Sequence, residues 1–142
     1  MYKRQILVNG NVMAYGFVAA QNGTGIVITP RTFTGSETPG TWASVAQVSD
    51  VTITYNVIHD TGLGSETAST DSYCTPAMNC IPSARIEYQN NLFYNIDLPN
   101  APNWCFQVDA PNELTLDHNT CVSGNANQQS LFVDRDVYKR QE

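Results

Sequence analysis

Apolar and polar residues alternate in four short stretches of the chain, and each stretch carries an asparagine at the same place. The stretches are Ile6–Tyr15, Val51–Asp60, Ile86–Asn95 and Leu114–Ser123, with Asn11, Asn56, Asn91 and Asn119 at the shared position. Residues five and three places before each asparagine are apolar or aromatic, whereas the residue two places before it is polar. A period of two predicts a strand with one buried face and one wet face, which bends at the asparagine and then continues.

Such a strand is not stable alone, so the four copies are expected to stack and share one core. Side chains at identical positions in stacked strands can hydrogen-bond to one another as a ladder, and this would satisfy asparagine amides buried at the bend. Four antiparallel strands of an ordinary sandwich are the alternative. The in-register repetition favours the parallel stack.

Three copies are followed by a further apolar run, which extends the repeat to three short strands. These runs are Gly25–Thr29, Trp104–Asp109 and Ser130–Asp134. Three strands and one asparagine per coil predict an all-β, right-handed parallel β-helix of about four coils, with the handedness given by the rule for parallel crossovers. A single domain over residues 6–137 is expected.

The asparagines are 45, 35 and 28 residues apart, whereas solenoid repeats of this kind need roughly 20–29 residues. The surplus is expected to form loops outside the stack. The expected loops are Pro30–Val48, Thr61–Ser83 and Asp97–Asn103.

The two ends of the chain do not follow the alternation. The motif Tyr2-Lys-Arg-Gln5 is repeated as Tyr138-Lys-Arg-Gln141, so residues 1–5 and 138–142 are interpreted as non-native tails of the kind found in metagenomic sequences. The chain is therefore interpreted as an internal piece of a longer parent protein.

Without these tails the formal charge is about −9, which would repel phosphate backbones and anionic membranes. Neither nucleic acid nor a membrane is expected as a partner. A charged fraction of only 14%, with abundant Asn, Thr, Ser and Gly, suits a secreted or cell-surface protein.

The stretches Gly25–Arg31, Asp50–Asn56, Arg85–Phe93 and Leu114–Thr120 resemble the right-handed β-helix region of the pectate-lyase-like superfamily and of secreted bacterial β-helix proteins. The resemblance covers about Ile6 to Asp136, and it lies in core and ladder positions, which are informative about fold rather than chemistry. It implies handling of extracellular polysaccharide, by lyases, hydrolases or epimerases, or by non-catalytic adhesins and tail fibres.

Candidate catalytic residues lie at outward positions of the repeat. Glu87 and Asp117 fall on neighbouring coils, where two carboxylates could serve a glycosidase. The resemblance implies acidic Ca²⁺ ligands in lyases, but these two residues with Gln89 fall short of the six to eight oxygens that Ca²⁺ requires. No metal site or cofactor is therefore expected in this chain, and Ca²⁺ is left to the parent protein. A solvated polar face is the alternative reading.

His59 and Asp60 follow the second asparagine, and a histidine beside an acid is a candidate general base. A surface histidine at a turn is the competing interpretation. If the protein is a lyase or glycosidase, Glu87, Asp117, His59 and Asp60 are expected to converge on one groove.

Four residues are candidates for substrate binding. Arg31 and Gln89 can bind sugar groups through polar atoms, although Arg31 can equally pair with an acid in its own loop. Trp42 and Trp104 can stack on sugar rings or cover the core beneath a loop. An exposed tryptophan beside a shallow groove, without clustered carboxylates, would favour a binding module.

The chain contains four cysteines. Cys74 and Cys80 bracket a short loop and could form a disulfide in an oxidising compartment, or less readily bind zinc. Cys121 is expected at an inward position as a small buried residue, and Cys105 in a similar role.

Three functions therefore remain open: an enzyme acting on polysaccharide, a glycan-binding module, and a structural or adhesin-like stalk. The expected partners are a polysaccharide and the remaining coils of the parent chain. Because end coils without caps expose strand edges, the isolated chain is expected to be unstable or to aggregate.

Overall fold

The computed structural model describes residues 5–15, 23–29, 47–68, 82–98, 101–109, 111–122 and 129–133. These residues form twelve β-strands and no helix. The strands make three sheets of four strands each, and every pairing in them is parallel. No helix in the described ranges is long and apolar enough to cross a membrane.

The three sheets, here named A, B and C, are visited in turn along the chain. Sheet A holds β1 (Ile6–Asn9), β4 (Ser49–Thr54), β7 (Ala84–Gln89) and β10 (Asn112–Asp117). Sheet B holds β2 (Val12–Ala14), β5 (Val57–His59), β8 (Leu92–Tyr94) and β11 (Thr120–Val122). Sheet C holds β3 (Thr24–Ile28), β6 (Leu63–Ala68), β9 (Trp104–Asp109) and β12 (Gln129–Val133).

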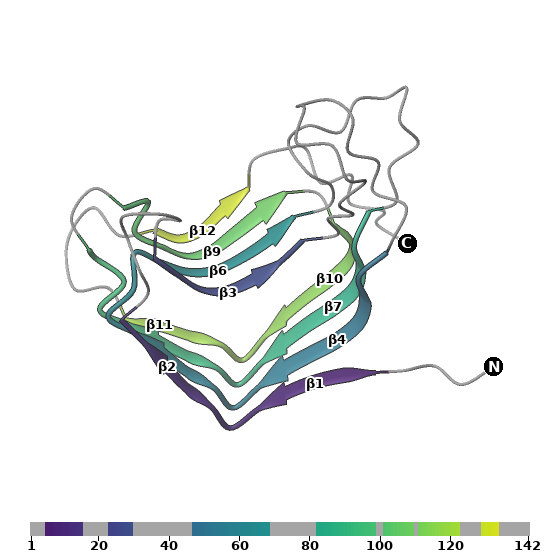
Figure 1. Ribbon diagram of the computed structural model, residues 1–142, viewed down its shortest axis with the longest axis horizontal. Helices are drawn as coiled ribbons and strands as arrows, with labels where there is room; N and C mark the ends of the chain where they lie inside the picture. Colours follow the sequence, from purple (N-terminus) through teal and green to yellow (C-terminus); the bar gives the residue numbers. More distant parts are fainter. Residues whose placement is uncertain are drawn as a thin grey trace, which may run out of the picture.

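Each set of three consecutive strands is one coil, so that coil 1 is β1–β3 and coil 4 is β10–β12. Figure 1 shows the coils stacked, with sheets A and B meeting at an angle where β1 runs into β2. The register within sheet A is the one that the repeat predicts. Val51 lies between Ile6 and Ile86, and Ile86 pairs in turn with Leu114.

The four asparagines lie at the bend between sheets A and B and form a ladder. The backbone N–H and Nδ2 of Asn11 donate to Oδ1 of Asn56 over 2.9 and 3.0 Å. Asn56 bonds to Asn91 in the same way, over 3.0 Å each, and Asn91 bonds to Asn119 over 3.1 and 2.9 Å. The residue before each asparagine has a positive φ, which turns the chain into the bend.

Tyr88 is fully buried at an inward position of β7, and its hydroxyl meets sheet C. It lies 2.5 Å from the Ser65 hydroxyl and 2.8 Å from the Thr67 hydroxyl, both of them buried on β6. Burial raises the pKa of Tyr88, although these two hydrogen bonds act in the opposite direction. The buried phenol therefore has hydrogen-bonding partners from a neighbouring coil.

The prediction of a loop over Thr61–Ser83 is wrong for residues 63–68, which form strand β6. The inward residues Ser65 and Thr67 are small and polar, so the segment lacks the apolar run that marks the third strand in the other coils. A buried hydroxyl without a hydrogen-bonding partner would destabilise the fold, and Tyr88 is the partner of both residues.

The third strand of one coil packs against the second strand of the next coil. A Cβ on Gly64 of coil 2 would lie 2.7 Å from Cδ1 of Phe93 in coil 3, and 2.5 Å from the carbonyl oxygen of Cys105. The absence of a side chain at Gly64 thus makes room for the Phe93 ring, which is fully buried.

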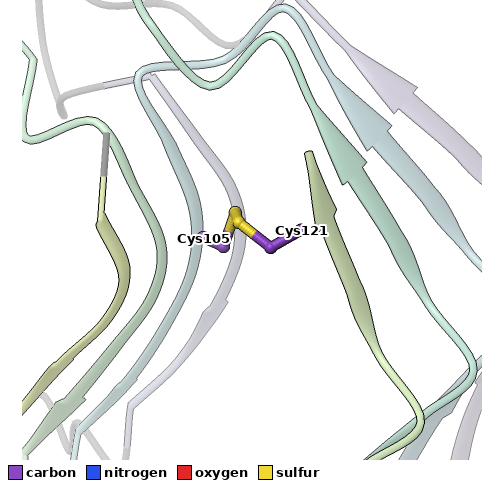
Figure 2. The surroundings of a disulfide bond; sticks show 2 residues. All are labelled: Cys105 and Cys121. Carbon is purple, nitrogen blue, oxygen red and sulfur yellow. A yellow bond between two sulfur atoms is a disulfide. The ribbon is translucent and has the colours of Figure 1, made fainter. Parts of the chain in front are cut away.

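One coil further along the stack, the same facing positions hold a disulfide bond. Cys105 on β9 is bonded to Cys121 on β11, with their Cα atoms 6.3 Å apart, as Figure 2 shows. Cys105 is fully buried, as the sequence predicted, and the bond between the two cysteines is a contact that the sequence did not predict. The pairing follows from the offset by one coil, which brings β9 of coil 3 opposite β11 of coil 4.

Several expectations lie outside the described residues. They concern Arg31, Trp42, the Cys74–Cys80 pair, most of the 30–48 loop, and the tails at residues 1–4 and 138–142. Of the third expected loop, residues 97–98 and 101–103 are described, and none of them is in a strand.

Candidate functional site

The outer face of sheet A is polar on β4, β7 and β10, because the alternation places the apolar residues of these strands inside. Its outward side chains on these three strands include Thr52, Thr54, Glu87, Gln89, Thr115 and Asp117. On β1 the outward residue Leu7 is apolar and 61% exposed. Glu87 lies between Thr52 and Thr115 in the register, and Gln89 pairs with Asp117. Glu87 and Asp117 therefore occupy the same face of adjacent strands, two residues apart in phase.

A hollow of about 310 Å³ lies on this face and is lined by Gln5, Asp50, Thr52, Arg85 and Glu87. Asp50 and Arg85 both have a positive φ, and they lie at equivalent positions at the start of β4 and β7. Arg85 Nε and Nη2 each donate to a carboxylate oxygen of Asp50 over 2.7 Å. These bonds raise the pKa of Arg85, because they favour its charged form.

A chain of hydrogen bonds crosses the strands beside this ion pair. Gln5, which is interpreted above as part of a non-native tail, donates from Nε2 to Oγ1 of Thr52 over 3.0 Å. That hydroxyl donates to Oε2 of Glu87 over 3.5 Å. Gln89 Nε2 donates to the other oxygen of Glu87 over 2.6 Å. The hollow therefore presents donors and acceptors that are already held in position.

Asp117 does not take part in this chain of hydrogen bonds and contacts His118 instead. Its Oδ1 lies 2.6 Å from Nδ1 of His118, and both side chains are largely exposed. Gln89 directs its amide nitrogen at Glu87. In the described ranges, no group of three or more His, Cys, Asp and Glu side chains is placed to hold a metal ion.

His59 and Asp60 lie on the other side of the bend, at the end of β5 in sheet B. Nδ1 of His59 is 2.5 Å from Oδ2 of Asp60, and Asn95 Nδ2 donates to Oδ1 of Asp60 over 3.2 Å. The bond from His59, and then that from Asn95, lowers the pKa of Asp60. The His59 ring stacks on Tyr94 at 4.7 Å between ring centroids, with only 3° between the planes.

The four candidate catalytic residues therefore do not converge on one groove. Glu87 and Asp117 precede the asparagine of their coil and lie on sheet A, whereas His59 and Asp60 follow theirs and lie on sheet B. The bend at the asparagines sets the two sheets at an angle, so that their outer faces point in different directions (Figure 1).

Of the expected substrate-binding residues, Gln89 does not line the hollow itself, but it is hydrogen-bonded to Glu87, which does. Trp104 is on sheet C, partly buried at the start of β9 and in register with Leu63. It does not line the hollow.

The sequence interpretation missed Asp50, Arg85, Tyr94 and Asn95. The repeat itself carried a signal for them, because Asp50 and Arg85 each stand six residues before an asparagine of the ladder. Asp60 and Asn95 likewise each stand four residues after one. Equivalent positions in stacked coils are neighbours, so an opposite-charge pair or an amide–carboxylate pair at one position predicts a contact.

Comparisons of the chain with protein-family models, with curated proteins and with solved structures found no match.

Proposed function

We propose that the chain is a four-coil part of a right-handed parallel β-helix of the pectate-lyase-like kind, and that it binds an extracellular polysaccharide along the outer face of sheet A. Three parallel sheets visited in a constant order and an asparagine ladder support the fold. The resemblance of the repeat to secreted bacterial β-helix proteins supports the class.

The observation that carries the binding proposal is the hollow with its fixed donors and acceptors. Sugar hydroxyls both donate and accept hydrogen bonds, so a sugar site needs groups of both kinds. Beyond the bonds that they make to Asp50 and Glu87, Arg85 and Gln89 retain further N–H hydrogens, and each Glu87 oxygen can accept a further bond. Groups held in place before binding lose less conformational entropy when a ligand arrives.

The charge of this face favours a neutral glycan as the ligand over an anionic one. Asp50, Glu87, Glu113 and Asp117 contribute four negative charges along sheet A, and Arg85 contributes one positive charge. Such a surface repels an anionic polymer. A neutral glycan is therefore a better ligand than a polyuronate, and the same repulsion excludes nucleic acid and anionic membranes from the proposal.

Secretion or display at the cell surface is part of the same proposal. The disulfide between Cys105 and Cys121 supports it, because such bonds persist in oxidising compartments and are rare in the cytosol.

Processing of a polysaccharide, by lyase or glycosidase chemistry, is the second candidate, and the His59–Asp60–Asn95 arrangement favours it. An imidazole held through one nitrogen by a carboxylate can accept a proton at the other nitrogen. Asn95 orients Asp60 in turn. A substrate for this group would lie on sheet B rather than in the hollow.

The binding proposal is tested by a glycan array with neutral, cationic and anionic oligosaccharides, followed by calorimetry on any hit. Glu87→Ala should abolish binding, whereas Glu66→Ala, which removes the same charge from β6 on sheet C, should leave it unchanged. Binding of polyuronates alone, or equal affinity in both variants, would contradict the proposal. If mass spectrometry shows that a bound glycan is shortened, the second candidate applies, and His59→Ala should stop the cleavage.

A further inference from the structure

Tyr55 is an exposed tyrosine on the bend between β4 and β5, where sheets A and B meet (Figure 1). Its side chain is 63% exposed, although coil 2 lies between coil 1 and coil 3 in the stack. The exposure of Tyr55 is therefore a property of the outer surface and does not come from a position at either end of the stack.

The backbone of Tyr55 is in the left-handed region, with a φ of 55°. The bend requires this conformation in every coil, since the equivalent residues Gly10, Asn90 and His118 have φ values of 66°, 53° and 51°. Glycine and asparagine adopt left-handed backbone readily, whereas a bulky side chain is disfavoured there. Tyrosine at this position therefore strains the bend, compared with the asparagine that stands one coil further along.

Packing within the protein does not compensate for this strain. Four tyrosines lie in the described ranges, and the rings of the other three each contact another aromatic or histidine ring. In the same ranges the Tyr55 ring has no such contact, and its hydroxyl makes no hydrogen bond. On the coil 1 side, a Cβ added to Gly10 would meet nothing within 4 Å, so no side chain lies against Tyr55 from that position. Strained residues that the fold itself does not use are typical of ligand sites.

Tyr55 lies next to the residues of the saccharide site proposed above. Its N–H donates to the carbonyl of Gln89 over 3.2 Å, and the side-chain amide of Gln89 donates to Glu87, which lines the hollow. Thr52, which also lines the hollow, stands three residues before Tyr55, or about 10 Å along an extended strand. A ligand that contacts both the hollow and Tyr55 is therefore longer than a single sugar ring.

The surroundings of Tyr55 suit a sugar better than a protein partner. The outward residues of β4 and β7 between the hollow and Tyr55 are polar, namely Thr52, Thr54, Glu87 and Gln89. A protein interface is built around a buried apolar core of several side chains. A single aromatic ring beside hydroxyl, amide and carboxylate groups instead matches a sugar, which has apolar C–H faces and a polar rim of hydroxyls.

We propose that Tyr55 is an aromatic platform on which one ring of the bound glycan stacks, while a neighbouring sugar of the same chain occupies the hollow. The proposal rests on the saccharide binding at sheet A proposed above. C–H groups on the face of a sugar ring carry a partial positive charge and are attracted to the negative face of an aromatic ring. The ligand is then an oligosaccharide that lies parallel to β4 and β7, from the hollow to the bend.

Calorimetry with an oligosaccharide selected on the glycan array tests the platform. Tyr55→Ala should weaken binding by about tenfold, as expected for the loss of one aromatic contact. Tyr55→Phe keeps the ring and should bind nearly as tightly as the unmodified chain. Tyr15→Ala is the matched control, because Tyr15 is also exposed (80%) and left-handed (φ of 60°) but follows β2 on sheet B. It should leave the affinity unchanged.

Tyr55→Asn separates a role in binding from a role in folding. Asparagine occupies the equivalent position in coil 3 and relieves the strain of the left-handed backbone. The midpoint of urea unfolding should therefore rise by about 0.5 M, while glycan binding weakens as it does in Tyr55→Ala. A tyrosine that served only to pack against its own protein would give a lower midpoint instead.

The results that would overturn the platform differ from those that would overturn saccharide binding itself. If Glu87→Ala abolishes binding but Tyr55→Ala binds as tightly as the unmodified chain, the platform is wrong and the site in the hollow stands. Equal losses in Tyr55→Ala and Tyr15→Ala, or a lower urea midpoint in Tyr55→Asn, would also overturn the platform. If the unmodified chain binds no glycan, the proposed function fails and the platform fails with it.

Discussion

Removing the asparagines of the ladder one at a time should destabilise the protein by amounts that depend on position in the stack. The side chain of Asn91 makes four hydrogen bonds. Its Nδ2 donates to the Ile53 carbonyl at 2.8 Å and to Asn119 at 2.9 Å, and its Oδ1 accepts two bonds from Asn56 at 3.0 Å each. Asn11, at the end, makes two, both through Nδ2.

Asn91→Ala would leave a buried N–H of Asn56 and a buried carbonyl of Ile53 without their partners. An unsatisfied buried group costs about 1–3 kcal/mol, and a typical hydrogen bond contributes about 1 kcal/mol. We therefore expect a loss of about 4 kcal/mol for Asn91→Ala. For Asn11→Ala, whose side chain is exposed and accepts no bond from another coil, we expect about 1 kcal/mol.

Urea unfolding followed by circular dichroism measures the difference. With a slope of about 2 kcal/mol per molar urea, the midpoint should fall by about 2 M for Asn91→Ala and by about 0.5 M for Asn11→Ala. Asn11→Ala serves as the control, because it makes the same chemical change at the end of the ladder. Equal losses at the two positions, or a loss below about 1 kcal/mol for Asn91→Ala, would refute the reasoning.

Three other changes test the core. Replacing both Cys105 and Cys121 by Ala should lower the free energy of unfolding by about 3 kcal/mol, the value for a loop of this length, as thermal melting would show. Gly64→Ala should abolish or strongly reduce folding, because the new Cβ would lie 2.7 Å from Phe93 and 2.5 Å from a backbone oxygen, and circular dichroism reports this. Tyr88 should make the protein less stable as the pH rises above about 10: its ordinary pKa is 10.0 and burial raises it in the folded state, so the unfolded chain releases the proton first.

Two of these changes have their own controls. Gly10→Ala, where a Cβ would meet nothing within 4 Å, should cost only about 1 kcal/mol for its positive φ. Tyr88→Phe should reduce the alkaline loss of stability measured by urea unfolding at pH 8 and pH 11. An unchanged melting temperature in the double cysteine variant, normal folding of Gly64→Ala, or the same pH dependence in Tyr88→Phe would contradict the packing described above.

Much of the architecture could be predicted because the repeat is a local pattern. The alternation around Asn56 and Asn91 specified which residues face inward, and parallel stacking in that register followed from it. Strand β6 could not be found in this way, since its inward residues Ser65 and Thr67 are polar. Their hydrogen-bonding partner Tyr88 is 21 residues or more away in the sequence.

The cysteine pairing depends on geometry between coils. Cys105 and Cys121 meet because a third strand faces the second strand of the following coil, and no residue pattern along the chain reports that offset. By contrast, the separation of Glu87 from His59 was predictable. One residue precedes the asparagine of its coil and the other follows it, so a bend at the asparagines places them on different sheets.

The stacking of the asparagines through parallel coils can be measured directly by NMR scalar couplings across hydrogen bonds. In the labelled protein, the backbone amide nitrogens of Asn11, Asn56 and Asn91 should each couple to the side-chain Cγ of the next asparagine, as the 2.9, 3.0 and 3.1 Å bonds require. Absence of all three couplings, with cross-strand Hα–Hα contacts typical of antiparallel pairing between these segments, would contradict the parallel stack.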